Sequence, residues 1–225
     1  MYAMVASRPD IAFAVSVVSQ HSKNPGPPHW TAVRRIIRYL AGTQTWGLMY
    51  GARNCGGFTD AEWGSGKDRR SVSGYVFMIN GAAVSCASKK QPTVALSSTE
   101  AEYVVLTQGV KESLWLGELL QDLGALKYQH EIRLLHCDNQ GAIALTKNPE
   151  YHARTKHIDI QYHFIRQHVE AGAIQLTYCP TYKMTADIFT KPLPRPQFQK
   201  HVLGLGVADL PGDQNDKSQK LNVHG

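Results

Sequence analysis

The chain has 225 residues, of which 43% are hydrophobic, so it can bury one substantial core with a small appendage. Its formal net charge of +6 favours an anionic partner such as nucleic acid. The opening apolar stretch is interrupted by Arg8, Pro9 and Asp10, and it has no run of the about 18 apolar residues that a membrane span needs. We therefore expect neither a signal peptide nor a membrane anchor. The four cysteines are isolated, which excludes a disulfide framework or a zinc site of the usual spacing and favours a reducing, intracellular setting.

The first 42 residues predict two helices, separated by the helix-breaking segment NPGPP at residues 24–28. Pro9 suits the first turn of the first helix, and Gly42 suits the end of the second. The polar side of the second helix has a basic group that either faces solvent or contacts phosphate: Arg34, Arg35 and Arg38.

From residue 43 the apolar period changes to two, which predicts strands. The pair Asn80-Gly81 separates two of these runs and is typical of a two-residue hairpin turn. After a short strand, WGLMY, we expect an antiparallel meander of three strands at about residues 56–63, 72–79 and 82–88.

Helical and strand patterns alternate after the meander. They predict a helix at 98–123, a strand at 131–137, helices at 139–147 and 155–172, a strand at 173–179, and a last helix that begins near Asp187. This order, βββαβααβα, predicts an α/β fold with one mixed five-stranded sheet and helices on both faces. After Lys191, a proline-rich segment leads to one weak helix and a polar tail that we expect to be disordered.

Two glutamates, Glu100 and Glu102, are separated by a single residue at the start of the long helix. At about 100° per residue, Glu100 shares its side of the helix with charged residues, whereas Glu102 shares its side with Leu106 and other apolar residues. We therefore expect Glu102 to face the core. A buried carboxylate is costly unless it is paired, hydrogen-bonded or bound to a metal. A capping box beginning at Thr99 is an alternative role for Glu102, but the same box fits Ser97 with Glu100.

Three aspartates could meet Glu102. Asp60 lies on the first strand of the meander, Asp138 directly follows the strand LLHC, and Asp187 follows the last strand. A right-handed crossover through the long helix sets the strand before Asp138 parallel to a strand of the meander, and pairing with the first strand would make Asp60 and Asp138 neighbours. Each aspartate also has a purely structural interpretation, as a turn residue, an N-cap or a first-turn acid. The four acids together favour a common site.

Several stretches, in this order over about residues 2–195, resemble the ribonuclease H domain of copia-type long-terminal-repeat retrotransposon polyproteins: SRPDIAFAV, HWTAVRRIIRYLAGT, GFTDAEW, RRSVSGYVF, SKKQPTVALSSTEAEY, CDNQGAIAL, RTKHIDIQYHFIR and ADIFTKPLP. The resemblance implies a ribonuclease H-like fold. It also implies three regions: residues 1–50 as a helical remnant of the reverse transcriptase thumb or connection, 51–195 as the ribonuclease H domain, and 196–225 as a partly disordered tail.

In this family the catalytic and metal-binding acids map onto Asp60, Glu102, Asp138 and Asp187. Carboxylate ligands call for a hard ion, Mg²⁺ or Mn²⁺, and the resemblance implies two ions. Asp60 would bridge both, Glu102 and Asp138 would complete one site, and Asp187 would hold the other ion. The implied reaction is hydrolysis of the RNA strand of an RNA–DNA hybrid, with Glu102 also contacting the ribose 2′-OH.

Basic residues cluster in two loops, SGKDRR and SKKQ. Because the first and third strands of the meander run the same way, both loops are expected at one end of the sheet. Their residues either contact the phosphates of the hybrid or form solvated loops: Lys67, Arg69, Arg70, Lys89 and Lys90.

Two other functions stay open on the sequence. One is a truncated or domesticated remnant that binds nucleic acid without cutting it. The other is an integrase or transposase of related fold, which is less favoured because those sites generally end with a glutamate where this chain has Asp187. The loop CPTYKM also lacks the histidine that many ribonucleases H have before the last aspartate. The resemblance further implies partners in the rest of a reverse transcriptase and integrase polyprotein, in a cytoplasmic particle or in the nucleus.

Overall fold

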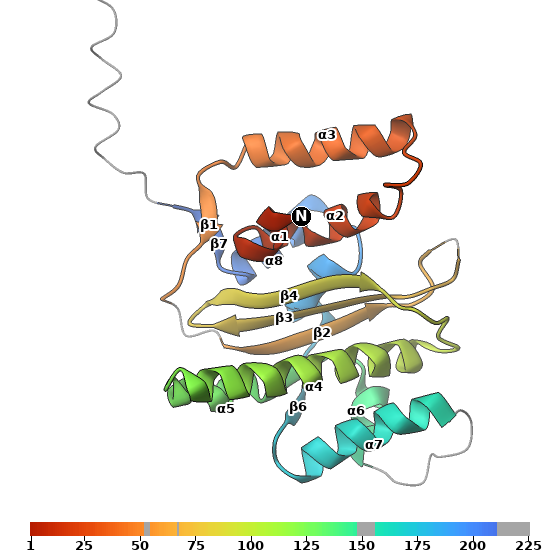
Figure 1. The fold of residues 1–225 in the computed structure, drawn as a ribbon, viewed down its shortest axis with the longest axis vertical. Helices are drawn as coiled ribbons and strands as arrows, with labels where there is room; N and C mark the ends of the chain where they lie inside the picture. Colours follow the sequence, from red (N-terminus) through yellow and green to blue (C-terminus); the bar gives the residue numbers. More distant parts are fainter. Residues whose placement is uncertain (52–54, 67, 148–155, 211–225) are drawn as a thin grey trace, which may run out of the picture.

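The computed structural model describes residues 1–51, 55–66, 68–147 and 156–210. Its main sheet has five strands in the order β4-β3-β2-β5-β6 (Figure 1). β2 pairs antiparallel with β3, which pairs antiparallel with β4, whereas β2–β5 and β5–β6 are parallel pairs. The predicted mixed five-stranded sheet is confirmed, with these bounds: β2 Gly56–Glu62, β3 Val72–Ile79, β4 Ala82–Lys90, β5 Leu134–Cys137 and β6 Gln175–Tyr178.

The hairpin between β3 and β4 has the predicted two-residue turn. Asn80 and Gly81 both have positive φ, 54° and 86°. This is the backbone that twists a hairpin in the same sense as its strands, and asparagine and glycine adopt it more readily than other residues. The turn therefore sets the register that later brings the basic loops to one end of the sheet.

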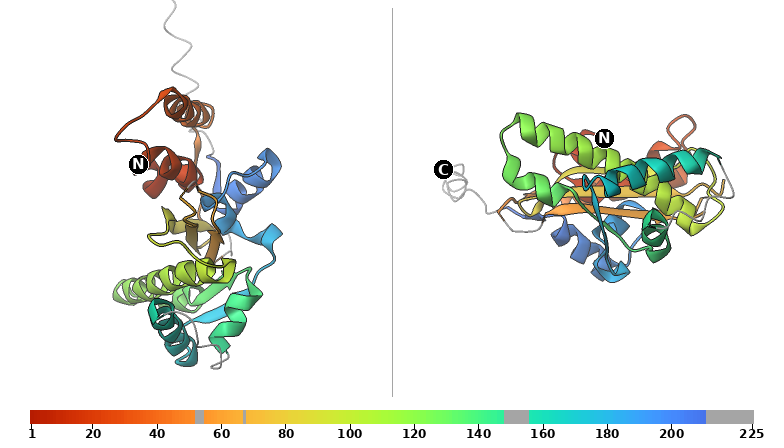
Figure 2. Two further views of the ribbon diagram at one scale, coloured as in Figure 1. Left: turned by 90° about the vertical axis from the view of Figure 1, so that its right-hand side faces the viewer. Right: turned by 90° about the horizontal axis from the view of Figure 1, so that it is seen from below.

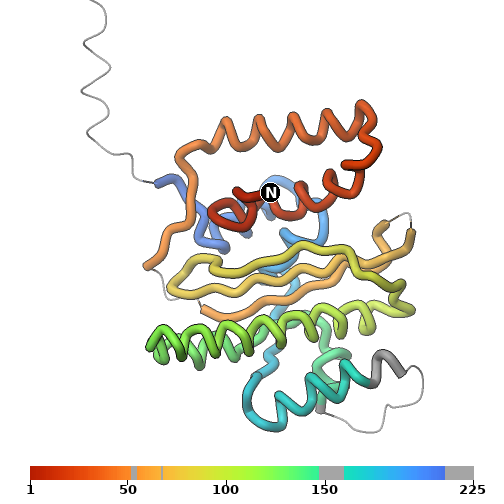
Figure 3. Tube along the Cα trace, in the orientation of Figure 1, coloured from red at the N-terminus to blue at the C-terminus, as the bar shows by residue number. Residues whose placement is uncertain are grey.

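Helices cover one face of the sheet, and α4 runs along β2 and β3 (Figure 3). The core on this face includes Phe77, Tyr103, Leu106, Leu135 and Ile165. Its helices are α4 Ser98–Asp122, η2 Leu126–Tyr128, α5 Gln129–Ile132, α6 Gln140–Lys147 and α7 Lys156–Glu170.

A second core lies on the opposite face, so the sheet is sandwiched between two helical layers (Figure 2). Neighbouring residues of β3 point to opposite faces: Phe77 joins the first core, whereas Val76 and Met78 join the second. This layer consists of α1 Tyr2–Ala6, η1 Pro9–Ile11, α2 Ala12–Ser19, η3 Thr181–Lys183, η4 Thr185–Phe189 and α8 Arg195–Gly204, with α3 Pro27–Ala41 outside α2 (Figure 1). The prediction of helices on both faces is confirmed.

The N-terminal helices are tied together by a buried ion pair. Arg8 Nη2 lies 2.8 Å from Asp10 Oδ2, and Tyr39 of α3 donates a hydrogen bond of 2.5 Å to the same oxygen. Arg8 also donates to the backbone oxygen of Thr43 at 2.9 Å. The buried side chains of Arg8 and Asp10 therefore both have partners, which offsets the cost of removing their charges from water.

The strand that follows the N-terminal helices pairs with the last described strand in a small second sheet. β1, Trp46–Leu48, pairs antiparallel with β7, Val207–Asp209, a strand that the sequence pattern does not predict. The helix predicted after Lys191 is present as α8, which places Val202 and Leu205 in the second core. The predicted disorder of the tail concerns residues 211–225, which lie outside the described residues.

Two elements differ from their predicted form. Residues 126–132 are helical turns, so the strand predicted at 131–137 begins only at Leu134. Ile132 is fully buried against α4, and its carbonyl accepts a hydrogen bond from Ser113 Oγ at 2.8 Å. A short apolar run can be buried equally well as a helix or as a strand, so its sequence pattern does not distinguish the two. Asp187 lies in the five-residue 3₁₀ helix η4 rather than in an α-helix, and prolines at 192 and 194 prevent its extension.

Within the described part of the chain, none of the helices is both long enough and apolar enough to span a membrane. All four cysteines lie among the described residues and are free thiols.

Candidate active site

The topology brings Asp60 and Asp138 to neighbouring positions. β2 and β5 are adjacent and parallel, and Thr59 of β2 is in register with Cys137 of β5. Asp60 and Asp138 each follow this pair by one residue. The predicted parallel pairing with a strand of the meander is therefore correct. The neighbour is the first strand, the case in which Asp60 and Asp138 become adjacent, and both aspartates lie at the same end of the sheet.

Glu102 faces the sheet from α4, and Glu100 does not. Glu102 is 4% exposed, and its Oε1 accepts a hydrogen bond of 3.1 Å from the backbone N–H of Ala61. Glu100 caps the helix instead: its backbone N–H donates to Ser97 Oγ, and its carboxylate accepts from the N–H of Leu96 at 2.7 Å. The assignment of Glu102 to the buried face is confirmed, and capping is the role of Glu100.

Asp187 reaches the site from η4, on the other face of the sheet. Thr190 Oγ1 donates a hydrogen bond to Asp60 Oδ2, which links η4 directly to β2. Lys191 Nζ lies 3.0 Å from Asp187 Oδ1 and 3.6 Å from Asp60 Oδ2. Asp60 and Asp187 therefore share one ammonium group.

The loop before Asp187 also contacts the site. Thr181 Oγ1 donates a hydrogen bond of 2.8 Å to Asp138 Oδ2. This loop is the one in which the sequence lacks the histidine of many ribonucleases H. In this chain, the hydroxyl group of Thr181 in that loop orients Asp138.

A glycine on β3 allows η4 to lie this close to β2. Gly74 is in register with Asp60, and a Cβ atom on Gly74 would lie 2.7 Å from Phe189 Cβ and from Thr190 Cγ2. Any larger residue would push η4 outward, because contacts this short are not tolerated. The absence of a side chain at residue 74 thus positions the segment that contains Asp187.

Burial and mutual repulsion disfavour the charged forms of Asp60, Glu102 and Asp187. Burial raises the pKa of Asp60 to about 6, with Lys191 opposing the shift and the charge of Asp187 adding to it. Burial, followed by the charges of Asp60 and Asp138, raises the pKa of Glu102 well above its usual value. The pKa of Asp187 is also raised, mainly by burial. A cation bound among these groups would relieve the repulsion.

The donor set suits a hard divalent cation. Ligand atoms of Glu102, Cys137 and Asp138 lie within 4.8 Å of one another. Burial raises the pKa of the Cys137 thiol, which therefore stays protonated and leaves the carboxylates as the ligands. Asp187 Oδ1 is buried, and its polar contact among the described residues is the ammonium group of Lys191 at 3.0 Å. Carboxylate oxygens of this kind are what Mg²⁺ and Mn²⁺ prefer.

The two basic loops lie at the same end of the sheet, as predicted. Val72 is in register with Lys90, so the segment before β3 lies beside the end of β4. Lys90 Nζ lies 2.8 Å from Asp68 Oδ1, and Arg70 Nε lies 3.8 Å from Asp68 Oδ2. These two cations therefore share an acidic partner in the loop itself. Arg69 is exposed, with φ of 60°.

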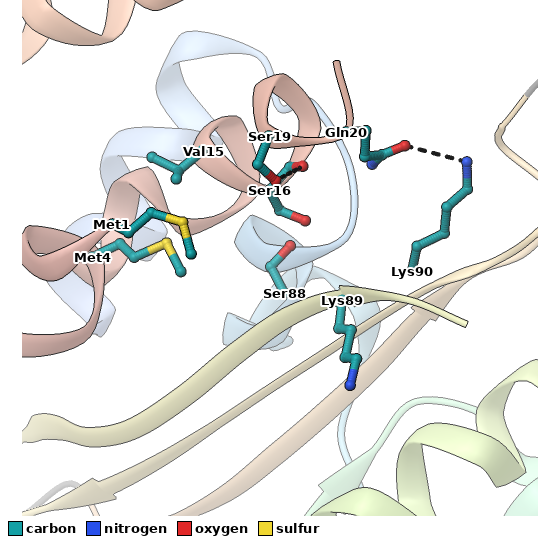
Figure 4. Close-up of a pocket in the computed structure, with 9 residues that line it drawn as sticks. All are labelled: Met1, Met4, Val15, Ser16, Ser19, Gln20, Ser88, Lys89 and Lys90. Atoms are coloured by element: carbon teal, nitrogen blue, oxygen red, sulfur yellow. Dashed lines mark hydrogen bonds between the residues drawn. The ribbon is translucent and has the colours of Figure 1, made fainter. Parts of the chain in front are cut away.

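Lys89 and Lys90 point to opposite sides of β4 (Figure 4). Lys90 extends toward α2 and donates a hydrogen bond of 3.3 Å to Gln20 Oε1. Both lysines line a pocket of about 270 Å³ between β4 and the N-terminal helices, which does not include the four acids. Lys89 is exposed. Lys67, the fifth predicted basic residue, lies outside the described residues.

The basic group of α3 lies apart from the acids. No residue of α3, all of which the structure describes, is buried. Figure 1 shows α2 and the sheet between α3 and α4. The fold therefore does not bring the α3 arginines to the carboxylates: Arg34, Arg35 and Arg38 are exposed.

Sequence reasoning missed three residues that contact the acids. Thr181, Thr190 and Lys191 received no role, although the last two lie within the motif ADIFTKPLP. The spacing of Asp187 and Lys191, four residues apart, is a signal for a local ion pair. The contact of Thr181 with Asp138 joins residues 43 apart in sequence and has no local signal.

No protein-family model matches the chain. It is 46% identical over 210 residues to the retrovirus-related Pol polyprotein from transposon TNT 1-94 of Nicotiana tabacum, an alignment that covers 91% of this chain and 16% of that protein. It is 39% identical over 209 residues to the corresponding polyprotein from transposon RE2 of Arabidopsis thaliana, covering 91% of this chain and 14% of that protein. These homologues are retrovirus-related Pol polyproteins of plant copia-type transposons, as the motifs of the chain predicted. It spans about one-sixth of the tobacco relative's length.

Two further likenesses are narrower. Over 120 residues the chain is 52% identical to secreted RxLR effector protein 161 of Plasmopara viticola, covering 52% of this chain and 84% of that protein. The solved structure of LC11-RNase H1, isolated from compost by a metagenomic approach, aligns with 66% of this chain and 98% of its own at a TM-score of 0.45 and 15% identity. That score is too low to transfer properties between the two proteins.

Proposed function

We propose that this chain is a metal-dependent endoribonuclease that hydrolyses the RNA strand of RNA–DNA hybrids, the ribonuclease H activity of a retrotransposon polyprotein. One observation supports it above the others: four acids from four separate elements lie around one end of the sheet, in a chain 46% identical to a Pol polyprotein. Buried acids without such a purpose are costly.

The metal-binding residues of the proposal are Asp60, Glu102, Asp138 and Asp187. Together they would hold Mg²⁺ or Mn²⁺, with two ions in the complete site. Bound divalent cations supply Lewis acidity, which favours deprotonation of the attacking water and stabilises the leaving 3′ oxygen of the phosphodiester.

The protein's own contribution is position and charge. Ala61 N–H fixes one oxygen of Glu102, and Thr181 fixes one oxygen of Asp138, so both carboxylates are held in place before substrate binds. In the proposal Glu102 also accepts a hydrogen bond from the ribose 2′-OH, which restricts cleavage to RNA.

The basic loops supply the proposed grip on the hybrid. Lys89 and Arg69 are exposed near the acids' end of the sheet and are free to meet phosphates. Arg70 and Lys90 would have to leave Asp68, so their contribution to affinity should be smaller. Because the chain spans 16% of the tobacco polyprotein, the other parts of such a polyprotein are proposed partners.

The test is a cleavage assay on an RNA–DNA hybrid with either strand labelled, in Mg²⁺. The wild type should cut the RNA strand only. Glu102→Gln removes the charge of a residue that contacts both metal and substrate, so cleavage should fall at least about a hundredfold with binding nearly unchanged. Glu100→Gln is the matched control on the same helix, and it should cut at the wild-type rate.

The same assay separates the alternatives. Cutting of the DNA strand at a comparable rate, or a fully active Glu102→Gln enzyme, would contradict the proposal. A wild type that binds hybrid but cuts neither strand, in Mg²⁺ or in Mn²⁺, would instead support a catalytically silent remnant that binds nucleic acid.

A further inference from the structure

Lys191 lies within the acidic cluster rather than on an open surface. Its side chain is 27% exposed, and its ammonium group contacts two carboxylates from different elements, Asp187 of η4 and Asp60 of β2. Both of these carboxylates are themselves nearly buried, with side-chain exposures of 8% and 4%. An ion pair in such surroundings is screened much less than a pair at the surface.

The two halves of the cluster differ in their local charge. On one side, the ammonium group of Lys191 lies 3.0 Å from Asp187 Oδ1 and 3.6 Å from Asp60 Oδ2. On the other side, no ion pair to Glu102 or Asp138 is formed within the described part of the chain; these acids are held by Ala61 N–H and by the Thr181 hydroxyl. One half therefore has a built-in cation and the other has neutral donors.

We propose that Lys191 acts as an internal counter-cation that competes with a metal ion for Asp60 and Asp187, so that the two metal ions bind with unequal affinity. The ion held by Glu102 and Asp138 binds first. The second ion binds more weakly, because Oδ1 of Asp187 and Oδ2 of Asp60 must exchange Lys191 for the metal. This inference rests on the metal centre of the proposed function.

The competition links binding of the second ion to the position of the Lys191 ammonium group. When the amine is displaced, it remains tethered four residues after Asp187 at the same end of the sheet. A positive charge released there favours an incoming phosphodiester. Lys191 is thus assigned as a positioning residue that couples occupancy of the second metal site to substrate charge.

The first experiment measures Mn²⁺ binding without nucleic acid, by calorimetry and by electron paramagnetic resonance. The wild type should bind one ion tightly and a second more weakly. Lys191→Met removes the charge but keeps the length of the side chain, and it should tighten the weaker ion about tenfold or more while leaving the first within about twofold. Lys127→Met, at an exposed lysine beyond the far end of α4, is the matched control and should behave as the wild type.

The outcomes are separable. An unchanged or weaker second ion in Lys191→Met would overturn the inference, even if the enzyme cleaves hybrids normally and the proposed function stands. Failure of the wild type and of Lys191→Met to bind any Mn²⁺ would overturn the metal centre as well. Loss of cleavage with unequal metal binding intact would count against the proposed function alone.

A second measurement uses the unmodified protein, in case Lys191→Met folds poorly. The reactivity of each lysine toward an amine-acylating reagent is followed by mass spectrometry at rising Mg²⁺. Displacement from the two carboxylates should make Lys191 several-fold more reactive at concentrations that load the second ion, whereas Lys127 should not change. An amine whose reactivity stays constant through both binding steps would contradict the competition.

Discussion

Single carboxyl groups in this protein differ because of what surrounds them, not because of their position in sequence. Glu100 and Glu102 are two residues apart, yet one caps a helix and the other is 4% exposed beneath it. The buried acid has a raised pKa, and Asp60 has one of about 6. In their charged forms, such buried acids destabilise the folded protein, and a bound cation offsets this destabilisation.

The raised pKa of Asp60 makes the free energy of unfolding depend on pH, and this can be measured with a metal chelator present. Below about pH 4, Asp60 is protonated in both the folded and the unfolded chain and costs nothing. As the pH rises toward 6, the unfolded chain loses this proton first, so the free energy of unfolding falls. Above pH 6, the raised pKa of Asp60 lowers the free energy of unfolding by about 3 kcal/mol.

Urea titrations of wild type and Asp60→Asn between pH 4 and pH 7 check this expectation. Asparagine does not titrate, so the variant should gain stability relative to the wild type as the pH rises. If the difference in the free energy of unfolding between the two proteins did not change with pH, the pKa of Asp60 would not be raised in the folded chain. Mg²⁺ should remove most of the difference, because it stabilises the charged form of Asp60.

At the scale of elements, glycines set how closely helices approach the sheet. A Cβ on Gly109 of α4 would lie 2.7 Å from Thr59 Cγ2, and Gly74 of β3 has the corresponding role toward η4. These two close contacts bring α4 and η4 onto opposite sides of β2. The acids from both helices can therefore meet at one strand end.

Gly74→Ala tests this arrangement. The added methyl group would collide with Phe189 and Thr190 and should cost about 1 to 3 kcal/mol in the free energy of unfolding. It should also weaken stabilisation by Mg²⁺, because η4 carries Asp187 away from Asp60. Thermal and urea unfolding, with and without Mg²⁺, measure both effects.

Gly117→Ala is the control for this prediction. Gly117 lies in α4 with nothing within 4 Å of an added Cβ, so alanine should raise stability by about 0.5 to 1 kcal/mol through helix propensity. A Gly74→Ala protein as stable as the wild type would show that η4 can shift freely.

At the scale of the whole molecule, the last described segment joins β1 and β4 and completes the second core. β1 pairs with β7, and the backbone N–H of Ala83 on β4 donates to the carbonyl of Leu205 at 3.0 Å. Leu205, directly after α8, is fully buried, whereas Leu203 within α8 is 65% exposed. Residues after α8 are thus part of the folded structure that supports η4.

A pair of alanine substitutions tests how much this closure contributes. Leu205→Ala should lower the free energy of unfolding by about 2 to 5 kcal/mol, since it opens a cavity in the core. Leu203→Ala should change it by less than about 0.5 kcal/mol. Equal effects of the two substitutions in urea denaturation would mean that α8 does not pack on the sheet in solution.

The sequence alone determined the features that depend on local geometry. Helical periodicity assigned Glu102 to the buried face, Asn80-Gly81 identified the hairpin, and the order of strands and helices indicated that the strand before Asp138 runs parallel to a strand of the meander. These signals are readable because side-chain direction repeats every 3.6 residues in a helix and every two in a strand. The positions of Asp60, Asp138 and Asp187 relative to the predicted strands made them candidate partners of Glu102, and the motif resemblance then implied the same set.

Only the tertiary structure decided the contacts between distant segments. It placed Lys191 and Thr190 against Asp60, 130 residues away in sequence for Thr190, and Thr181 against Asp138. It also joined β1 to β7 and turned residues 126–132 into helical turns. The physical reason is that such pairs depend on how closely whole elements pack, and packing is decided by volumes brought together from the entire chain.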